Sequence, residues 1–180
     1  MKAAIVMFAA LLSVGQSGPV TEAGSWPVYL RRAGAIRIGM SLAAVRRALG
    51  DPAAFLAGQS INEPAQLDAE CAYLSSRSVP KNLVFMFSRG LVIRIDVRGS
   101  GIRTASGAEV GDTEDSITRL YPGRITVAPH KYIEGGHYLN YRAVDRVDHE
   151  YGMVFETESG RVTRFRTGTL AGVALVEGCG

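Results

Sequence analysis

The chain contains an internal repeat. Residues 38–50 (IGMSLAAVRRALG) are matched 72 positions later by residues 110–123 (VGDTEDSITRLYPG). Residues 84–95 (VFMFSRGLVIRI) are matched 70 positions later by residues 154–165 (VFETESGRVTRF). A unit that occurs twice with diverging side chains is typical of a scaffold that displays a surface, because catalytic residues are rarely kept in duplicate. The repeat therefore constrains the architecture more than the activity.

The N-terminus is typical of a secretory signal peptide. In residues 1–15, Lys2 provides a thin positive region and residues 3–14 are almost entirely apolar. This run is too short to span a bilayer, which takes about 20 residues. We expect cleavage before Gln16 or after Ala23, and the alternative is an uncleaved apolar helix. The mature protein would then be periplasmic or secreted, with no integral membrane segment.

Three segments follow the signal peptide. Residues 16–34, which contain Gly, Pro, Ser and a lone tryptophan, are expected to form a flexible leader. The repeat places a first unit at residues 35–107 and a second unit at residues 108–180. About 160 residues in total are enough for one compact domain or two small ones.

The charge of the chain excludes some partners. Its 20 Lys and Arg face 17 Asp and Glu, a net charge of +3, and no run of five like charges occurs. This excess is too small for the electrostatic footprint of a nucleic-acid-binding protein or of a basic membrane-surface helix. The sequence also lacks a Gly-x-Ser-x-Gly nucleophile motif, phosphate-binding loops and metal-protease helices. We therefore predict no cofactor.

The two cysteines, Cys71 and Cys179, are expected to form a disulfide bond. In an exported chain two thiols are more often paired than free. The bond would close a loop of about 107 residues, which stabilises the fold by about 4–5 kcal/mol in the chain-entropy model. The alternatives are two unpaired thiols or pairing between chains. A zinc site at either cysteine is not expected, because no further Cys or clustered His lies nearby.

Local patterns predict an α+β fold in which each tandem unit packs short helices on an antiparallel β-sheet. One helix is expected from the N-cap Ser41 to Gly50, and another from the N-cap Thr113 to Pro122. Strands are expected at residues 71–74, 82–87, 91–97, 124–127, 137–142, 153–155 and 162–166. In the strand at 91–97, strict alternation places Leu91, Ile93, Ile95 and Val97 on one face.

The helix-entry pattern Ile-Gly-Met-Ser-Leu at residues 38–42 and the later glycine-turn hairpin resemble β-lactamase-inhibitory-protein-like domains and outer-membrane-assembly-lipoprotein (SmpA/OmlA-type) domains. The resemblance covers most of residues 35–178. It implies secretion, a helical layer on an antiparallel sheet, and function through protein contact on the sheet face. The chain lacks the inhibitors' disulfide within each unit and the lipid-anchor cysteine of the assembly lipoproteins. It resembles still more closely uncharacterised exported bacterial proteins whose C-terminus carries Glu-Gly-Cys, as residues 177–179 do here.

The most distinctive segment, residues 129–141, is rich in Tyr and His. Tyr and His combine apolar area with a polar tip, which favours them at recognition surfaces. We expect a binding surface here with three tyrosine anchors, Tyr132, Tyr138 and Tyr141, and with His130 and His137 beside them. One alternative is a metal site formed by His130, His137 and Glu134 across a Gly-Gly turn. Another is that the tyrosines are core or edge residues.

Two further groups of charges have structural interpretations. The acidic and histidine residues at 145–150 are expected to form a solvated hairpin loop, because they lack the spacing of a calcium loop. Arg94, Asp96, Arg164 and Arg166 lie in strands at positions that alternate with apolar residues. They are expected to form cross-strand ion pairs, and the alternative is a face that attracts anions.

Together these observations favour a non-enzymatic exported binding protein that contacts its partner through a tyrosine-rich sheet surface. Its partner would be a protein of the cell envelope or exterior, and inhibition of an envelope or extracellular enzyme is one form such binding takes. The alternatives are a periplasmic metal-dependent hydrolase that uses His130, His137 and Glu134, or an envelope-assembly accessory factor.

Overall fold

The computed structural model describes residues 26–58 and 69–179. The expected signal peptide and the first part of the expected leader lie outside the described residues. Within the described ranges, no helix is long and apolar enough to cross a membrane. The mixture of helices with antiparallel sheets confirms the α+β class.

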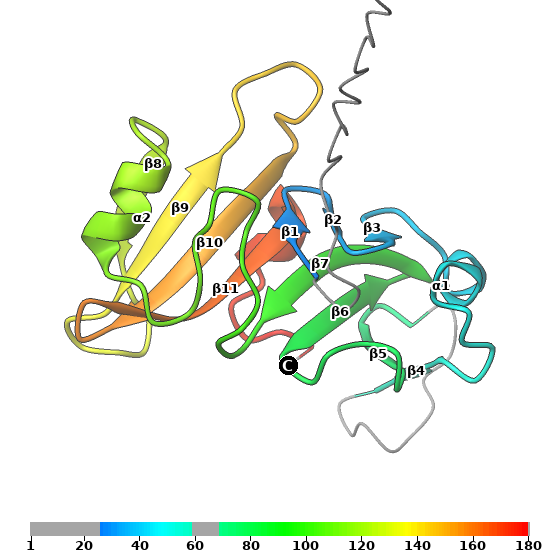
Figure 1. The fold of residues 1–180 in the computed structure, drawn as a ribbon. Helices are drawn as coiled ribbons and strands as arrows, with labels where there is room; N and C mark the ends of the chain where they lie inside the picture. Colours follow the sequence, from blue (N-terminus) through cyan, green and yellow to red (C-terminus); the bar gives the residue numbers. More distant parts are fainter. Residues whose placement is uncertain (1–25, 59–68, 180) are drawn as a thin grey trace, which may run out of the picture.

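An eight-stranded antiparallel sheet forms the centre of the molecule (Figure 1). In spatial order its strands are β4 (Phe55–Ala57), β5 (Ala72–Ser75), β6 (Leu83–Ser88), β7 (Leu91–Val97), β11 (Arg161–Thr169), β10 (Tyr151–Glu158), β9 (His137–Arg142) and β8 (Ile125–Pro129). In each half the first strand lies at an edge of the sheet and the last strand lies at its centre. The last strand of the first half, β7, pairs there with the last strand of the second half, β11.

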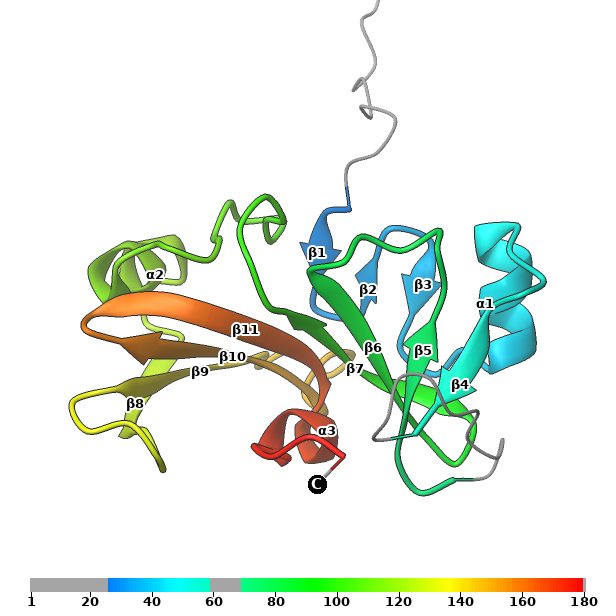
Figure 2. The same ribbon diagram turned by 90° about the horizontal axis from the view of Figure 1, so that it is seen from below.

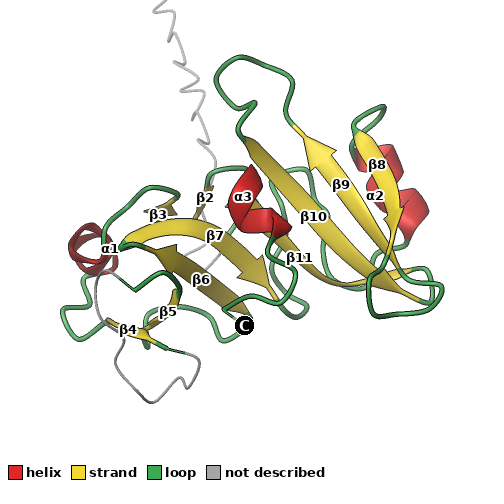
Figure 3. Cartoon of the chain, turned by 180° about the vertical axis from the view of Figure 1, so that it is seen from behind, coloured by secondary structure: helices red, strands yellow, loops and turns green. Residues whose placement is uncertain are grey.

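Helices lie on both faces of this sheet. α1 (Leu42–Leu49) and α2 (Glu114–Leu120) bury Val45 and Ile117 in the same hydrophobic cluster as Phe85 and Phe155 of the sheet. The short helix α3 (Leu170–Ala174) packs against β7, β10 and β11 from the opposite side, as Figure 2 and Figure 3 show. The face that carries α1 and α2 is therefore the core face.

The expected starts of both helices and the end of α1 are confirmed, whereas α2 ends at Leu120, two residues before Pro122. The Ser41 hydroxyl accepts the Ala44 N–H at 3.3 Å, and Gly50 ends α1 in the left-handed region at φ 62°. The Thr113 hydroxyl caps α2 by accepting the Ser116 N–H at 3.2 Å. These caps satisfy N–H groups that have no partner inside the helix.

The same contacts occur at matching positions of the two halves. In each half the segment before the helix forms two backbone hydrogen bonds with the hairpin's second strand, Gly39–Val92 and Val92–Met40 in one, and Gly111–Val162 and Val162–Asp112 in the other. Each hairpin turns through a non-glycine residue of positive φ followed by glycine, at Arg89-Gly90 and Ser159-Gly160. Positive φ at both central residues is typical of the two-residue hairpin turn that suits the twist of the strands.

A β-bulge in each hairpin corrects the predicted alternation. Phe87 pairs with Val92 and Met86 pairs with Arg94, so Ile93 is the extra residue. The bulge moves Val92 to the core face, where it is fully buried, and leaves Leu91 46% exposed. The expectation that Leu91 and Ile93 share the core face with Ile95 and Val97 is therefore wrong. The second hairpin has its bulge at the matching place, between Glu156 and Thr157.

The expectation of a flexible leader is wrong for residues 26–34. The strands β1 (Val28–Tyr29), β2 (Arg32–Ala33) and β3 (Ile36–Arg37) form a small antiparallel sheet. Val28 and Ala33 are fully buried in the main core, and the Thr167 hydroxyl donates to the Leu30 carbonyl at 2.7 Å. The leader packs because its alternate apolar side chains complete the core, a tertiary effect that its Gly and Pro content conceals.

Close approach of β7 and β11 requires glycine at position 168. A Cβ there would lie 2.3 Å from the Ile93 carbonyl oxygen and 2.9 Å from the Arg94 Cα. We expect Gly168→Ala to lower the free energy of unfolding by about 1–3 kcal/mol or more, since backbone atoms must move. Urea denaturation measures the loss. Gly58→Ala, where a Cβ meets open space, is the matched control. Equal stabilities of the two variants would contradict this reading of the strand junction.

Candidate binding face of the sheet

The sheet face opposite α1 and α2 carries a row of polar side chains, here called the charged face. Side chains alternate along a strand, so the neighbours of the core residues Ile95 and Phe165 point to the other side. One row across four paired strands comprises Asp96 of β7, Arg166 of β11, Val154 of β10 and Asn140 of β9. A second row comprises Arg164, Glu156 and Tyr138.

Glu156 is the centre of the ion pairs on this face. Its carboxylate is 2% exposed and accepts from Arg164 Nε at 2.5 Å and from Arg166 Nη1. Arg94 pairs separately with Asp96, Nε to Oδ2, at 2.9 Å. The four predicted residues do form ion pairs, but Arg94–Asp96 lies within β7, and the cross-strand pairs of Arg164 and Arg166 go to Glu156. Arg94, Asp96 and Arg166 are buried.

The two arginines hold Glu156 in its charged form. Burial acts to raise the pKa of Glu156, but the charge of Arg166 and hydrogen bonds from Arg164 and Arg166 outweigh it, so the pKa lies below its ordinary value. A depressed carboxyl pKa means that the ionised group stabilises the fold.

Residues 170–179, here called the C-terminal segment, cover the middle of the charged face. Arg94 Nη1 donates to the carbonyl oxygens of Gly172 at 3.1 Å and Leu175 at 2.5 Å, and Arg166 Nε donates to Val173 O at 2.7 Å. These carbonyls lie in or just after α3, where helix C-terminal carbonyls lack intrahelical partners. The guanidinium groups of Arg94 and Arg166 therefore find acceptors in these carbonyls, and the carbonyls find donors in the guanidinium groups.

A disulfide bond holds the end of this segment. Cys71 and Cys179 are bonded, with an S–S distance of 2.00 Å and a Cα–Cα distance of 5.4 Å, and no free cysteine remains. The Cys179 N–H also donates to the Tyr73 hydroxyl at 3.0 Å. The predicted disulfide is present, and such a bond suggests an oxidising, extracytoplasmic compartment.

A surface cluster anchors the same segment on its other side. Glu177 accepts from Lys131 Nζ at 3.1 Å and from the Tyr132 hydroxyl. The hydrogen bond from Tyr132, and to a lesser extent the one from Lys131, holds the pKa of Glu177 below its usual range. Because these groups are exposed, the cluster positions the segment more than it stabilises the fold.

His130 has a structural environment. Its Nδ1 accepts the backbone N–H of Tyr132 at 3.1 Å and of Ile133 at 3.2 Å, so the proton lies on Nε2, which faces Glu156 at 3.3 Å. The ring stacks on Tyr138 with centroids 4.4 Å apart. His130 therefore helps to hold the Tyr138 ring and the Glu156 carboxylate in place on the charged face.

His137 points the other way. It pairs with Pro129 in the sheet, one residue from His130, and its Nδ1 lies 2.9 Å from Glu114 Oε1 at the start of α2. Glu134 is exposed. The structure therefore does not bring His130 and His137 to a common site, and no group of three or more His, Cys, Asp or Glu that could hold a metal occurs within residues 26–58 and 69–179.

The three predicted tyrosine anchors divide between the two faces. Tyr138 lies on the charged face, and Tyr132, 58% exposed, lies next to it at the C-terminal segment. Tyr141 lies on the core face, where its ring packs 5.2 Å from that of Tyr121. Strand alternation accounts for the division, since Tyr138 and Tyr141 are three residues apart in β9.

A groove runs beside Tyr138. It has a volume of about 140 Å³ and is lined by polar residues of β9 and apolar residues of α3 and the segment after it: Tyr138, Asn140, Arg142, Leu170, Val173, Ala174 and Val176. Sequence reasoning missed this groove because five residues of α3 give no helical signal of their own. It also missed Glu156, although strand parity places Glu156 on the face of Arg164 and Arg166.

The loop at residues 145–150 is a solvent-facing turn, as expected. Asp145 Oδ1 accepts the N–H groups of Val147 at 3.0 Å and Asp148 at 2.8 Å, and Asp148 pairs with Arg31 at 2.9 Å. Asp145 therefore shapes the loop, and Asp148 connects it to the leader.

Comparison with known proteins found no match: no family model, no curated protein and no solved structure is similar to the chain.

Loss of the disulfide should loosen the C-terminal segment. We expect Cys179→Ser to lower the free energy of unfolding by about 2–5 kcal/mol, because the unfolded chain loses a long covalent loop. Thermal unfolding measures the loss, and hydrogen exchange should show faster exchange in residues 170–179. Cys71→Ser is the matched control and should behave alike. Two reactive thiols per chain in unfolded, unreduced wild-type protein would contradict the bond.

Glu156 should make stability depend on pH. Because its folded pKa is depressed, its contribution is present above the unfolded pKa of about 4.3 and is lost as pH falls through the folded pKa. Glu156→Gln should cost about 3–5 kcal/mol at pH 7, the cost of breaking a buried pair, and progressively less toward pH 3. Urea denaturation at several pH values tests this. Glu158 is exposed in the same strand, and Glu158→Gln should change the free energy of unfolding little at any pH.

Proposed function

We propose that the protein is an exported, non-enzymatic binding protein that contacts another protein through the charged face. The observation that carries this proposal is the groove beside Tyr138, whose side chains are held in place by the buried cluster of Glu156, Arg166 and His130. An aromatic side chain that is already fixed recognises a partner at low entropic cost. An inhibitor of an envelope or extracellular enzyme and an envelope-assembly factor differ only in that partner.

We infer that the two halves are tandem units of one design. In support, the pre-helix hydrogen bonds, the hairpin turns and the bulges recur at offsets of 70 to 72 residues. The matching positions Asp96 and Arg166 lie opposite each other where β7 pairs with β11, as expected for a local two-fold axis between the units. This plan agrees with the resemblance to β-lactamase-inhibitory-protein-like domains, in which one sheet face is free for a partner.

The metal-dependent hydrolase is not favoured by the geometry, because His130 and His137 engage carboxylates on opposite faces of the sheet. Elemental analysis of the purified protein separates the two hypotheses. Stoichiometric zinc or another transition metal would favour the hydrolase.

Tyrosine substitutions test the binding face. A partner isolated by pull-down from the envelope fraction of the source cell should bind the Tyr138→Ala variant about 1–3 kcal/mol more weakly, as measured by calorimetry. Tyr29→Ala is the matched control, since Tyr29 is exposed on a leader strand that packs on the core face. Tyr141→Ala should lower stability instead, because that ring packs on Tyr121. Equal affinity of the Tyr138 and Tyr29 variants would overturn the assignment.

A further inference from the structure

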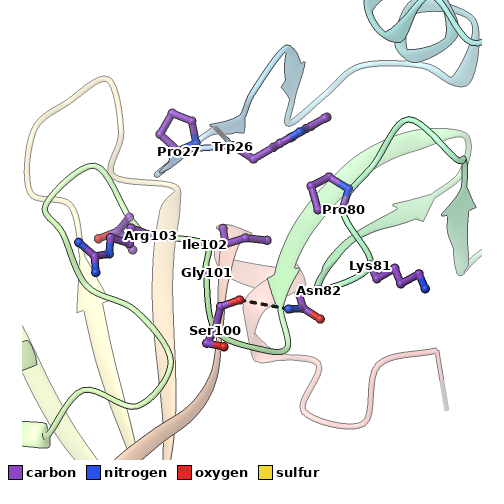
Figure 4. Close-up of a pocket in the computed structure, with 10 residues that line it drawn as sticks. Trp26, Pro27, Pro80, Lys81, Asn82, Ser100, Gly101, Ile102 and Arg103 are labelled. Atoms are coloured by element: carbon purple, nitrogen blue, oxygen red, sulfur yellow. Dashed lines mark hydrogen bonds between the residues drawn. The ribbon is translucent and has the colours of Figure 1, made fainter. Parts of the chain in front are cut away.

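A larger concavity lies away from the charged face, where the leader meets the connection between the two halves (Figure 4). Its walls come from Trp26 and Pro27 of the leader, residues 80–82 before β6, and residues 100–104 after β7. Its volume of about 530 Å³ is within the range of small-molecule sites, roughly 300–1,000 Å³. None of its lining residues belongs to the charged face or to the groove beside Tyr138.

The apolar wall of this pocket is fixed in place. Trp26 packs against Phe85 with ring centroids 6.3 Å apart. The indole also lies directly against the backbone of Gly34, where a Cβ would come within 2.7 Å of the ring. Ile102, only 7% exposed, is anchored in the core. Trp26, Pro80 and Ile102 surround the opening in Figure 4, so a ligand meets a preformed apolar surface.

The polar base of the pocket is fixed as well. The Asn82 side-chain amide donates to the Ser100 carbonyl at 3.1 Å. Gly99 lies beneath that amide, since a Cβ there would approach it to 2.8 Å.

Two cations, Lys81 and Arg103, lie at the rim of the pocket. Arg103 forms two hydrogen bonds to Glu109, at 2.8 and 3.1 Å, which offset its charge. Lys81 forms no ion pair within the described parts of the chain, and its ammonium end extends outward from the pocket in Figure 4. Its flexible four-carbon stem can place the ammonium group over the opening. The pocket therefore matches an apolar body that carries one negative charge.

We propose that this pocket binds a small amphiphilic carboxylate. Its hydrocarbon body lies between Trp26, Pro80 and Ile102, and its carboxylate meets Lys81 at the rim. This inference is independent of the proposed function on the charged face.

Intrinsic fluorescence tests the proposal directly, because Trp26 is the only tryptophan of the chain. Decanoate, titrated below its micelle-forming concentration, should change the Trp26 emission saturably. Decanol should bind more weakly than decanoate. Lys81→Gln should weaken decanoate binding about two- to fivefold, the effect of an exposed ion pair, and should leave decanol binding unchanged.

Two variants make the test specific. Lys131→Gln removes the charge of a lysine that pairs with Glu177 on the other side of the sheet, and should change neither titration. Pro80→Ala shortens the apolar wall but keeps the carbonyl that accepts the Leu83 N–H, and should weaken both ligands. Calorimetry repeats each titration without relying on the indole. The proposal would be overturned if decanoate gave no saturable signal or if both lysine variants lost decanoate affinity equally. It would also be overturned if a proline-rich peptide saturated the pocket and decanoate did not.

Discussion

The pairing of β7 with β11 joins the two halves of the sheet and sets how their buried charged residues face each other. It sets Asp96 opposite Arg166 and Arg94 opposite Gly168, and the absence of a side chain at Gly168 lets the backbones meet. Because side chains alternate, a slip of one residue would turn the arginines into the core and the phenylalanines outward. A single continuous core then forms beneath both halves, with Phe85 from one and Phe155 and Phe165 from the other.

Burying ions on such a face costs desolvation free energy, so each must find compensating partners. Glu156 obtains two guanidinium groups and the His130 ring, while Arg94 obtains Asp96 and two main-chain carbonyls. A buried ion cluster is weak evidence for stability, since apolar residues of similar volume serve stability equally well. Under the proposed function, the cluster would serve specificity by fixing the side chains that line the groove.

The sequence predicted the features that depend on local chemistry. Ser41 and Thr113 as caps, the glycine hairpin turns and the strand at residues 137–142 follow from propensities of a few neighbouring residues. The bulge at Ile93 and the packing of Val28 into the core could not be predicted in this way, because both depend on partners distant in the chain. The division of Tyr138 from Tyr141 follows from strand parity, so the sequence contained that signal. The identity of a partner has no local signature at all.

The C-terminal segment changes what the charged face can offer a partner. α3 fills the space over Arg94 and Arg166, and the bond to Cys71 and the contacts of Glu177 hold the segment at both sides. With the disulfide formed, a partner therefore cannot reach the centre of the ion cluster. A partner of the proposed kind would meet instead the groove along β9 and the exposed ring of Tyr132. The buried charges then act indirectly, by fixing the side chains and the short helix that form the accessible rim.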